Sequence, residues 1–230
     1  MRKLFASDIP KEPELPLHVD SGPEETTEAA EQPGKHVQCK RMKGRHFDKR
    51  VKSELALEKE LPWHFEPGCS YHCISFGDVD SLTYLRAIVK QQKIEYCLIS
   101  TWCMAITDAK EIENWIEKGY IGRIDFYVGE IFQGSYSGVY FYLKDVAKRN
   151  NGRICIFKNH SKVMAGFGEH FDFVIESSAN INTNPRCEQA TITIDTGLSC
   201  FYKDFFDEVN SFNGDFEGWN KYEFNQNKKG

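Results

Sequence analysis

The chain has 230 residues, which is enough for one full-sized domain with a core and a tail. Its composition is 40% hydrophobic and 13% aromatic, which excludes a chain that is disordered throughout. The formal net charge of −5 excludes a protein that is basic over its whole surface, but it leaves room for a local basic region because the charges are unevenly spread.

The first two segments of the chain differ in charge. Residues 1–34 are rich in Pro, Glu, Thr and Ser and show no apolar period, so we expect a disordered acidic tail. Residues 35–60 begin with a run of basic residues and are expected to form a basic linker or arm. This run could be no more than a solvated linker, or it could grip the phosphates of a nucleic acid. The candidates for phosphate binding are Lys40, Arg41, Lys43 and Arg45.

From residue 61 onward, strand-like and helix-like stretches alternate. This alternation predicts an α/β domain over residues 61–213, with a largely parallel sheet and helices on both faces, and a polar tail over residues 214–230. Strands are predicted at residues 71–76, 94–100, 121–131, 153–157, 162–165, 171–177 and 190–195. Helices are predicted at residues 79–91, 108–118, 139–148 and 200–212.

Small and polar residues lie where three of these predicted strands run out, at residues 75–78, at residues 100–103, and at residues 129–132 with the stretch 133–138 behind them. Ligands of α/β sheets collect at the carboxyl ends of strands, so these residues are candidates for the rim of a pocket. The sequence contains no Walker A, G-x-G-x-x-G, G-x-S-x-G or H-E-x-x-H motif. The common signatures of nucleotide binding, serine hydrolysis and zinc proteolysis are therefore missing.

The eight cysteines do not show the usual spacing of a zinc site. Cys69, His72 and Cys73 are residue types that zinc accepts, but no second C-x-x-C pair follows them, and adjacent residues of a strand point to opposite faces. We therefore expect buried thiols and no metal, with a zinc scaffold as a distant alternative. Free thiols, and the absence of a secretory or membrane-spanning apolar run, favour a cytoplasmic protein with no membrane segment.

Residues 159–189 carry side chains that are suited to phosphodiester chemistry. On a strand, His160 and Lys162 would project from the same face, and a hairpin of the next two strands would bring Ser178 and Asn180 close to them. Imidazole can attack phosphorus, while an ammonium and an amide can hold the non-bridging oxygens. A nearby Glu can fix the tautomer of the imidazole. The alternative is a half-exposed hairpin with polar residues on its outer face.

This stretch resembles the signature of the phospholipase D superfamily, H-x-K-x4-D followed by G-S-x-N. The sequence His160-Ser161-Lys162 matches the first part, and Ser177-Ser178-Ala179-Asn180 matches the second. Two positions depart from the signature, because Phe167 stands in the place of the Asp and Ser177 in the place of the Gly. The resemblance implies a phospholipase D-like fold in which the catalytic residues are His160, Lys162, Asn180 and Glu188. Ser178 would assist in binding the substrate, and Glu176 competes with Glu188 for the role of the carboxylate.

The H-x-K motif occurs once, because each of the other six histidines lacks a Lys two residues further on. The family's mechanism uses two histidines, so the resemblance implies a homodimer that shares one site. It also implies a phosphohistidine intermediate and no need for a metal or cofactor. We therefore predict a metal-independent phosphodiesterase and favour a nuclease with nucleic acid as its partner. The alternatives are a non-catalytic module that binds nucleic acid or a protein, and an enzyme that processes phospholipids.

Overall fold

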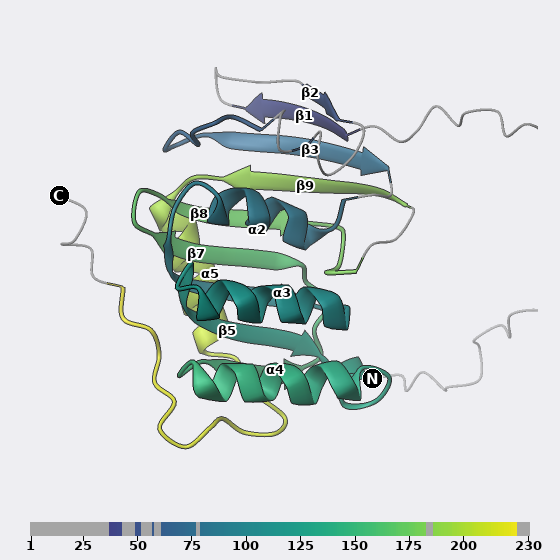
Figure 1. Ribbon diagram of the computed structural model, residues 1–230, viewed down its shortest axis with the longest axis vertical. Coiled ribbons are helices and arrows are strands. Elements are labelled where there is room, and N and C mark those ends of the chain that lie inside the picture. The colour runs from purple at the N-terminus through teal and green to yellow at the C-terminus, as the bar shows by residue number, and fades with distance from the viewer. Residues whose placement is uncertain are drawn as a thin grey trace, which may run out of the picture. The chain divides into compact units, whose positions relative to one another are not determined.

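A sheet of nine strands runs through the part of the chain that the structure describes (Figure 1). The computed structural model describes residues 37–42, 49–51, 57, 61–76, 79–182 and 186–224, with the backbone alone for residues 37–42, 49–51 and 76. The described residues belong to one compact unit. The predicted acidic tail, residues 1–34, lies outside the described residues, as do Lys43 and Arg45.

The strands follow one another across the sheet in the order β2-β1-β3-β9-β8-β7-β4-β5-β6. Their bounds are Val37–Met42 for β1, Lys49–Val51 for β2, Ser70–Phe76 for β3, Ile94–Thr101 for β4, Ile121–Gly129 for β5, Arg153–Phe157 for β6, Val163–Gly168 for β7, Asp172–Ser177 for β8 and Cys187–Thr193 for β9. The sheet thus takes in β1 and β2, which lie in the segment that we expected to be a basic arm.

The sheet is mixed, so the expectation of a largely parallel sheet was wrong. Only the β4–β5 and β5–β6 pairs of the described strands are parallel, and the other six pairs are antiparallel. The reason is that β7, β8 and β9 follow one another with no helix between them, and strands joined by short connections pair as antiparallel neighbours. The α/β class with helices on both faces is confirmed.

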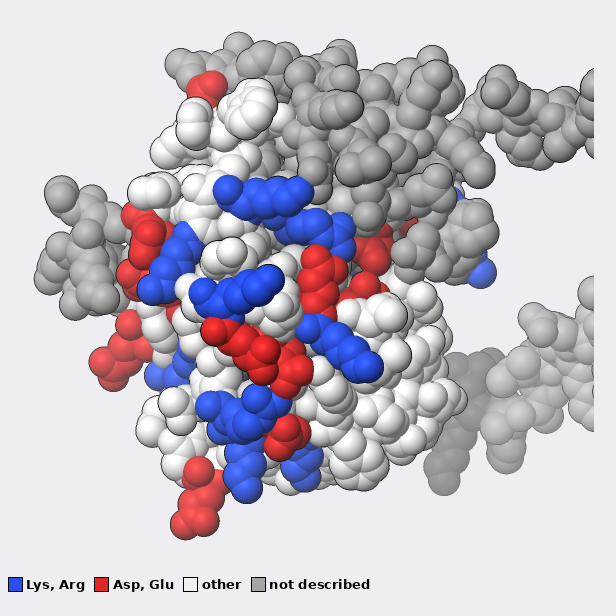
Figure 2. All heavy atoms as spheres, viewed as in Figure 1, with Lys and Arg blue, Asp and Glu red and all other residues white. Residues whose placement is uncertain are grey.

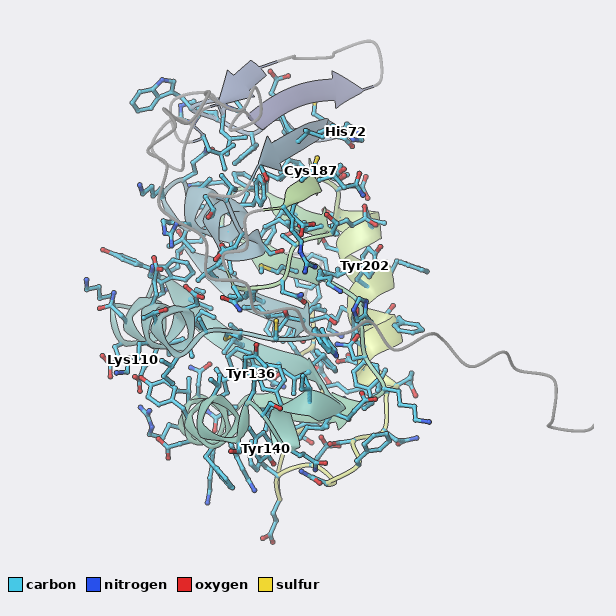
Figure 3. The ribbon with its side chains drawn as sticks, turned by 90° about the vertical axis from the view of Figure 1, so that its right-hand side faces the viewer. His72, Lys110, Tyr136, Tyr140, Cys187 and Tyr202 are labelled. Atoms are coloured by element: carbon cyan, nitrogen blue, oxygen red, sulfur yellow. The ribbon has the colours of Figure 1, made fainter. Side chains whose placement is uncertain are left out.

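Helices α2 (Ser81–Val89), α3 (Ile106–Glu117) and α4 (Ser137–Arg149) cover one face of the sheet, and α5 (Thr196–Asp207) lies on the other (Figures 1 and 3). A short 3-10 helix, η1 (Glu130–Gln133), follows β5. Helix α5 begins before its predicted start at residue 200, because Asp195 caps it by accepting a hydrogen bond of 2.7 Å from the backbone N–H of Leu198. None of the helices in the described ranges is both long enough and apolar enough to span a bilayer.

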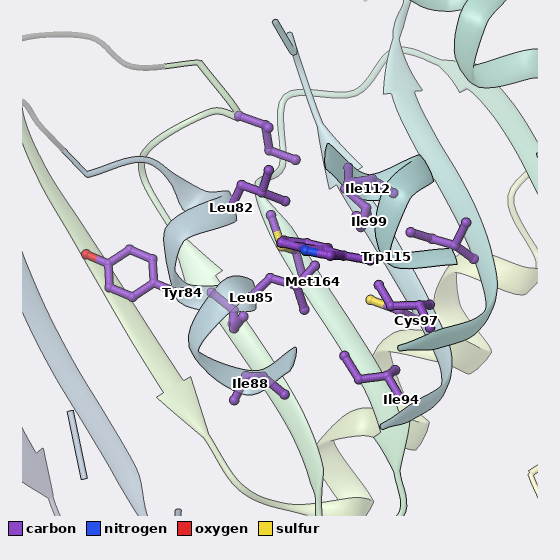
Figure 4. Packing of buried hydrophobic residues seen from close by; sticks show 14 of the residues in the cluster. Leu82, Tyr84, Leu85, Ile88, Ile94, Cys97, Ile99, Ile112, Trp115 and Met164 are labelled. Carbon is purple, nitrogen blue, oxygen red and sulfur yellow. The ribbon is translucent and has the colours of Figure 1, made fainter. Parts of the chain in front are cut away.

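Each face of the sheet has its own apolar cluster. Leu82, Leu85 and Ile88 lie along one side of α2 and pack with Met164 of β7 and Trp115 of α3 (Figure 4). Their spacing of three residues is the helical period that predicted this element. Of the seven cysteines whose side chains the structure describes, five are buried, and no disulfide links those seven.

The residues after α5, which we expected to belong to a polar tail from residue 214 onward, contact the face that α5 covers. The ring of Tyr222 stacks on Tyr96 at 4.4 Å between centroids, and Phe224 stacks on Phe167 at 4.2 Å. The buried guanidinium of Arg153 forms an ion pair with Asp215, in which Nη2 lies 3.1 Å from Oδ2. Aromatic stacking and a shielded ion pair therefore hold this segment against the sheet.

We predict that Phe167→Ala lowers the free energy of unfolding by about 3–5 kcal/mol, because it empties a fully buried site and removes the partner of Phe224. Urea denaturation followed by far-UV circular dichroism measures the effect. The matched control is Phe141→Ala on α4, where the side chain is 64% exposed, and there we expect a change within about 0.5 kcal/mol. Equal effects in both variants would contradict this packing.

Candidate functional site

A pocket of about 190 Å³ lies where β4 ends, β7 begins and β8 ends. Five residues of the predicted site line it together, namely His160, Lys162, Ser178, Asn180 and Glu188. Trp102, Cys103, Asn182 and Arg186 also contribute to the lining. Figure 3 faces this end of the sheet, with Tyr136 on the side of α2–α4 and Tyr202 on α5.

His160 and Lys162 lie in the loop between β6 and β7, and not on a strand as we expected, because β7 begins at Val163. Their side chains nevertheless meet. Lys162 Nζ lies 2.9 Å from His160 Nδ1 and 3.4 Å from Nε2, and it donates a hydrogen bond of 2.6 Å to the backbone oxygen of His160. The ring itself is exposed, so a ligand in the pocket can reach it.

Asn159 fixes this loop, and our sequence analysis did not identify it. Its Nδ2 donates hydrogen bonds of 2.9 Å to Ser100 Oγ on β4 and to the backbone oxygen of Tyr127 on β5. Its Oδ1 accepts bonds of 2.9 Å and 2.7 Å from the backbone nitrogen and the hydroxyl of Ser161. Asn159 is only 5% exposed, so its four bonds tie the loop to two strands from inside the protein.

The turn after β8 supplies Ser178 and Asn180. Ser177, which stands in the place of the signature's Gly, closes this turn, since its hydroxyl donates to the backbone oxygen of Gln189 at 3.1 Å and accepts from the backbone nitrogen of Ala179 at 3.0 Å. Asn180 Oδ1 accepts a bond of 3.3 Å from the backbone nitrogen of Trp102. The NH₂ group of Asn180 has no acceptor among the described residues, so both of its protons are available to a ligand.

Glu188 contacts Ser178 and not His160. Its Oε2 accepts a hydrogen bond from Ser178 Oγ, and no described carboxylate bonds to the ring of His160. Our expectation that Glu188 holds the imidazole is therefore not met in this structure. Glu176, the competing candidate, accepts a hydrogen bond from Tyr202 on α5 and does not line the pocket.

The pocket changes the acidity of two of its groups. Burial lowers the pKa of the Lys162 ammonium, although the negative charge of Glu188 acts in the opposite direction. Burial raises the pKa of the Cys103 thiol, while hydrogen bonds with Tyr136 and Asn182 and the charge of Lys162 act against it. Cys103 is therefore a neutral thiol at neutral pH, which makes it a weak nucleophile beside His160.

The remaining predicted residues lie away from this pocket or are described only in part. Phe167, which stands in the place of the signature's Asp, is buried on the face of α5. Its neighbour across the hairpin is Asp172, which accepts a bond of 2.7 Å from Thr196 Oγ1. Lys40 and Arg41 lie on β1, in register with His72 and Tyr71 of β3.

The residues that we considered for zinc do not gather into a cluster. Cys69 and Cys73 are buried, and His72 Nδ1 lies 3.1 Å from Thr191 Oγ1 on the neighbouring strand. No group of three or more His, Cys, Asp or Glu side chains in the described part of the chain could hold a metal ion.

No model of a known protein family and no curated protein sequence matches the chain. Among solved structures, the chain is similar to a phosphatidylserine synthase from Haemophilus influenzae Rd KW20, with 12% identity, a TM-score of 0.39 and coverage of 60% of this chain and 38% of the other. It is also similar to the archaeal chromatin protein TrmBL2, with 13% identity, a TM-score of 0.42 and coverage of 60% and 50%.

A third similar structure is a polyphosphate kinase from Porphyromonas gingivalis, with 14% identity, a TM-score of 0.41 and coverage of 66% of this chain and 23% of the other. The chain therefore spans half or less of the length of each of these proteins. At such low identity the function of the chain has to be argued from its own pocket.

We predict that Gly129→Ala lowers the free energy of unfolding by about 1–3 kcal/mol and displaces the loop of His160. A methyl group at this position would lie 2.8 Å from Trp102 Cδ1 and 2.9 Å from the backbone oxygen of Asn159. Thermal unfolding measures the stability, and NMR chemical shifts of the histidine ring protons report the displacement.

Gly138→Ala in α4 is the matched control, because nothing lies within 4 Å of the added methyl group. This variant should be neutral or more stable by up to about 1 kcal/mol, since Ala favours the helix. A Gly129→Ala protein as stable as this control would contradict the close packing of the loop.

Proposed function

We propose that the chain is a phosphodiesterase of the phospholipase D type that acts on nucleic acid through a phosphohistidine. The observation that carries the proposal is the common pocket of His160, Lys162, Ser178, Asn180 and Glu188, which come from three separate parts of the chain. A nucleophile, a cation and an amide around one cavity are the groups that phosphoryl transfer requires.

The reaction proceeds in two displacements. A ring nitrogen of His160 attacks phosphorus, the P–N bond forms, and the bond from phosphorus to the leaving oxygen breaks. That oxygen takes a proton from a second imidazole and departs as an alcohol. Water then attacks phosphorus, gives its proton to the second imidazole, and the P–N bond breaks to release the phosphate product and free His160.

Lys162 and Asn180 stabilise the charge on the non-bridging oxygens. Lys162 Nζ lies against the ring of His160 in the structure, and an anionic phosphate attracts the ammonium more strongly than a neutral ring nitrogen does. Binding of the substrate therefore draws the lysine toward phosphorus and frees the ring for attack. The free NH₂ group of Asn180 supplies further donors, so the chemistry requires no metal.

The second imidazole comes from a second copy of the chain in this account. His160 is the one histidine among the described residues that line the pocket, and the first displacement needs a nucleophile and a proton donor at the same time. A two-fold dimer that brings His160 of the partner subunit to the same phosphate meets this need. Light scattering coupled to size-exclusion chromatography measures whether the protein is a dimer. A monomer that remains fully active at all concentrations would contradict the shared site.

Nucleic acid is the proposed substrate because the basic residues expected to grip it lie in the arm that includes Lys40, Arg41, Lys43 and Arg45. Among the described residues of the face that α2–α4 cover, Lys and Arg alternate with Asp and Glu (Figure 2). Pairs such as Arg86 with Glu111 and Arg149 with Glu113 neutralise charge on these helices.

We predict that the protein cleaves DNA or RNA in excess EDTA and that His160→Ala abolishes the cleavage, because the imidazole forms the covalent bond. Gel analysis of end-labelled single- and double-stranded substrates at matched salt measures the rate. His170→Ala is the matched control, since His170 is exposed at the opposite end of the hairpin and should leave the rate unchanged.

Two results would argue against this function. If EDTA abolished the cleavage, the metal-independent mechanism would be excluded. Binding that salt weakens, with no cleavage by the wild-type protein, would indicate a non-catalytic module on this fold.

A further inference from the structure

Trp102 is a partly exposed aromatic residue in the wall of the pocket, and several contacts fix its position. Its backbone nitrogen donates to Asn180 Oδ1 at 3.3 Å, and its ring lies 5.4 Å from the ring of His160 with an angle of 50° between the planes. Gly129 lies directly against the indole, where a methyl group would come within 2.8 Å of Cδ1. The backbone of Trp102 is therefore tied to Asn180, and its indole lies against Gly129 and beside the ring of His160.

The ring of Trp102 does not belong to the core. It is part of neither of the two apolar clusters of the described residues, whereas Trp115 is buried within one of them. A partly exposed indole that lies beside a polar pocket, and that belongs to neither cluster, leaves apolar surface for a ligand.

The pocket offers a polar surface and an aromatic surface, which match the phosphate and the base of a nucleotide. His160, Lys162 and Asn180 present a nucleophile and hydrogen-bond donors, which suit a phosphate. Trp102 presents a flat apolar surface directly beside them, and the bases of nucleic acids stack on such side chains whatever their sequence. A phosphate with a neighbouring base can contact the polar residues and the indole at the same time. A phosphate without a base contacts only the polar residues.

We propose that Trp102 forms a stacking subsite for the base next to the reacting phosphate, and that the preferred ligand is therefore single-stranded nucleic acid. This inference rests on the proposed function, since it assigns the phosphate to the pocket of His160. In a duplex each base already stacks on its neighbours, so a base can reach the indole only after it has been unstacked. Stacking on Trp102 thus disfavours the duplex.

The test uses binding, so that it does not depend on turnover. Every protein in the test is the full chain with His160→Asn, which prevents turnover and keeps a planar side chain beside the indole. Fluorescence anisotropy measures the binding of a labelled single-stranded oligonucleotide. An oligonucleotide of the same length with abasic sites serves as the probe that has phosphates and no bases. Trp102→Leu removes the stacking surface and Trp102→Phe keeps a ring, while Trp63→Leu is the matched control because Trp63 is 90% exposed.

We expect Trp102→Leu to weaken binding of the single strand by about 5- to 150-fold, the range that corresponds to the loss of one stacked base. Trp102→Phe should retain most of the affinity, and Trp63→Leu all of it. Binding of the abasic oligonucleotide should be the same in all of these proteins. The protein without a tryptophan change should bind the oligonucleotide with bases more tightly than the abasic one, which gives a test that needs no folded variant at position 102.

Equal affinity for the abasic oligonucleotide and the one with bases would overturn the subsite. The subsite would also be overturned if the protein bound the duplex more tightly than the single strand. Tighter binding of anionic phospholipid vesicles than of either nucleic acid would overturn it as well. The proposed function is judged separately by cleavage. A wild-type protein that cleaves while Trp102→Leu binds normally refutes the subsite alone, whereas base-dependent binding without any cleavage refutes the chemistry alone.

Discussion

The buried amide of Asn159 is the interaction on which the arrangement of the site depends. It donates to Ser100 and to the backbone oxygen of Tyr127, so it joins the loop of His160 to both of the strands that end beside it. Because a buried amide that loses its partners is costly, the loop is confined to the position that satisfies all four bonds. The placement of His160 and Lys162 in the pocket follows from this constraint and not from the strand geometry of β7.

A second constraint acts on the face of the sheet that α5 covers. Phe167 occupies the place of an Asp in the resembling family, and the rings of Tyr222 and Phe224 lie over it. An aromatic stack is thus built at this position of β7, the strand that begins directly after Lys162. Phe167 therefore contributes to the packing on the face that α5 covers, and it does not line the pocket.

The sequence was sufficient to predict the order of most elements and the group of residues that share the pocket. The hairpin of β7 and β8 follows from two apolar runs around a turn, and it places Ser178 and Asn180 beside Lys162. The direction of the strands was missed, because an apolar run reports burial and not orientation. The contact of Asn159 with Ser100 was also missed, since it joins residues 59 positions apart and only the folded chain brings them together.

The central claim is that His160 becomes covalently bound to phosphorus, and the most direct test is to trap that intermediate. A labelled oligonucleotide is mixed with excess protein, quenched with alkaline denaturant during the first turnover, and the protein is digested for mass spectrometry. Our account predicts a phosphoryl adduct on the peptide that contains His160, rising and then falling as product appears. Turnover without any adduct at His160, or with the adduct on another residue, would contradict it.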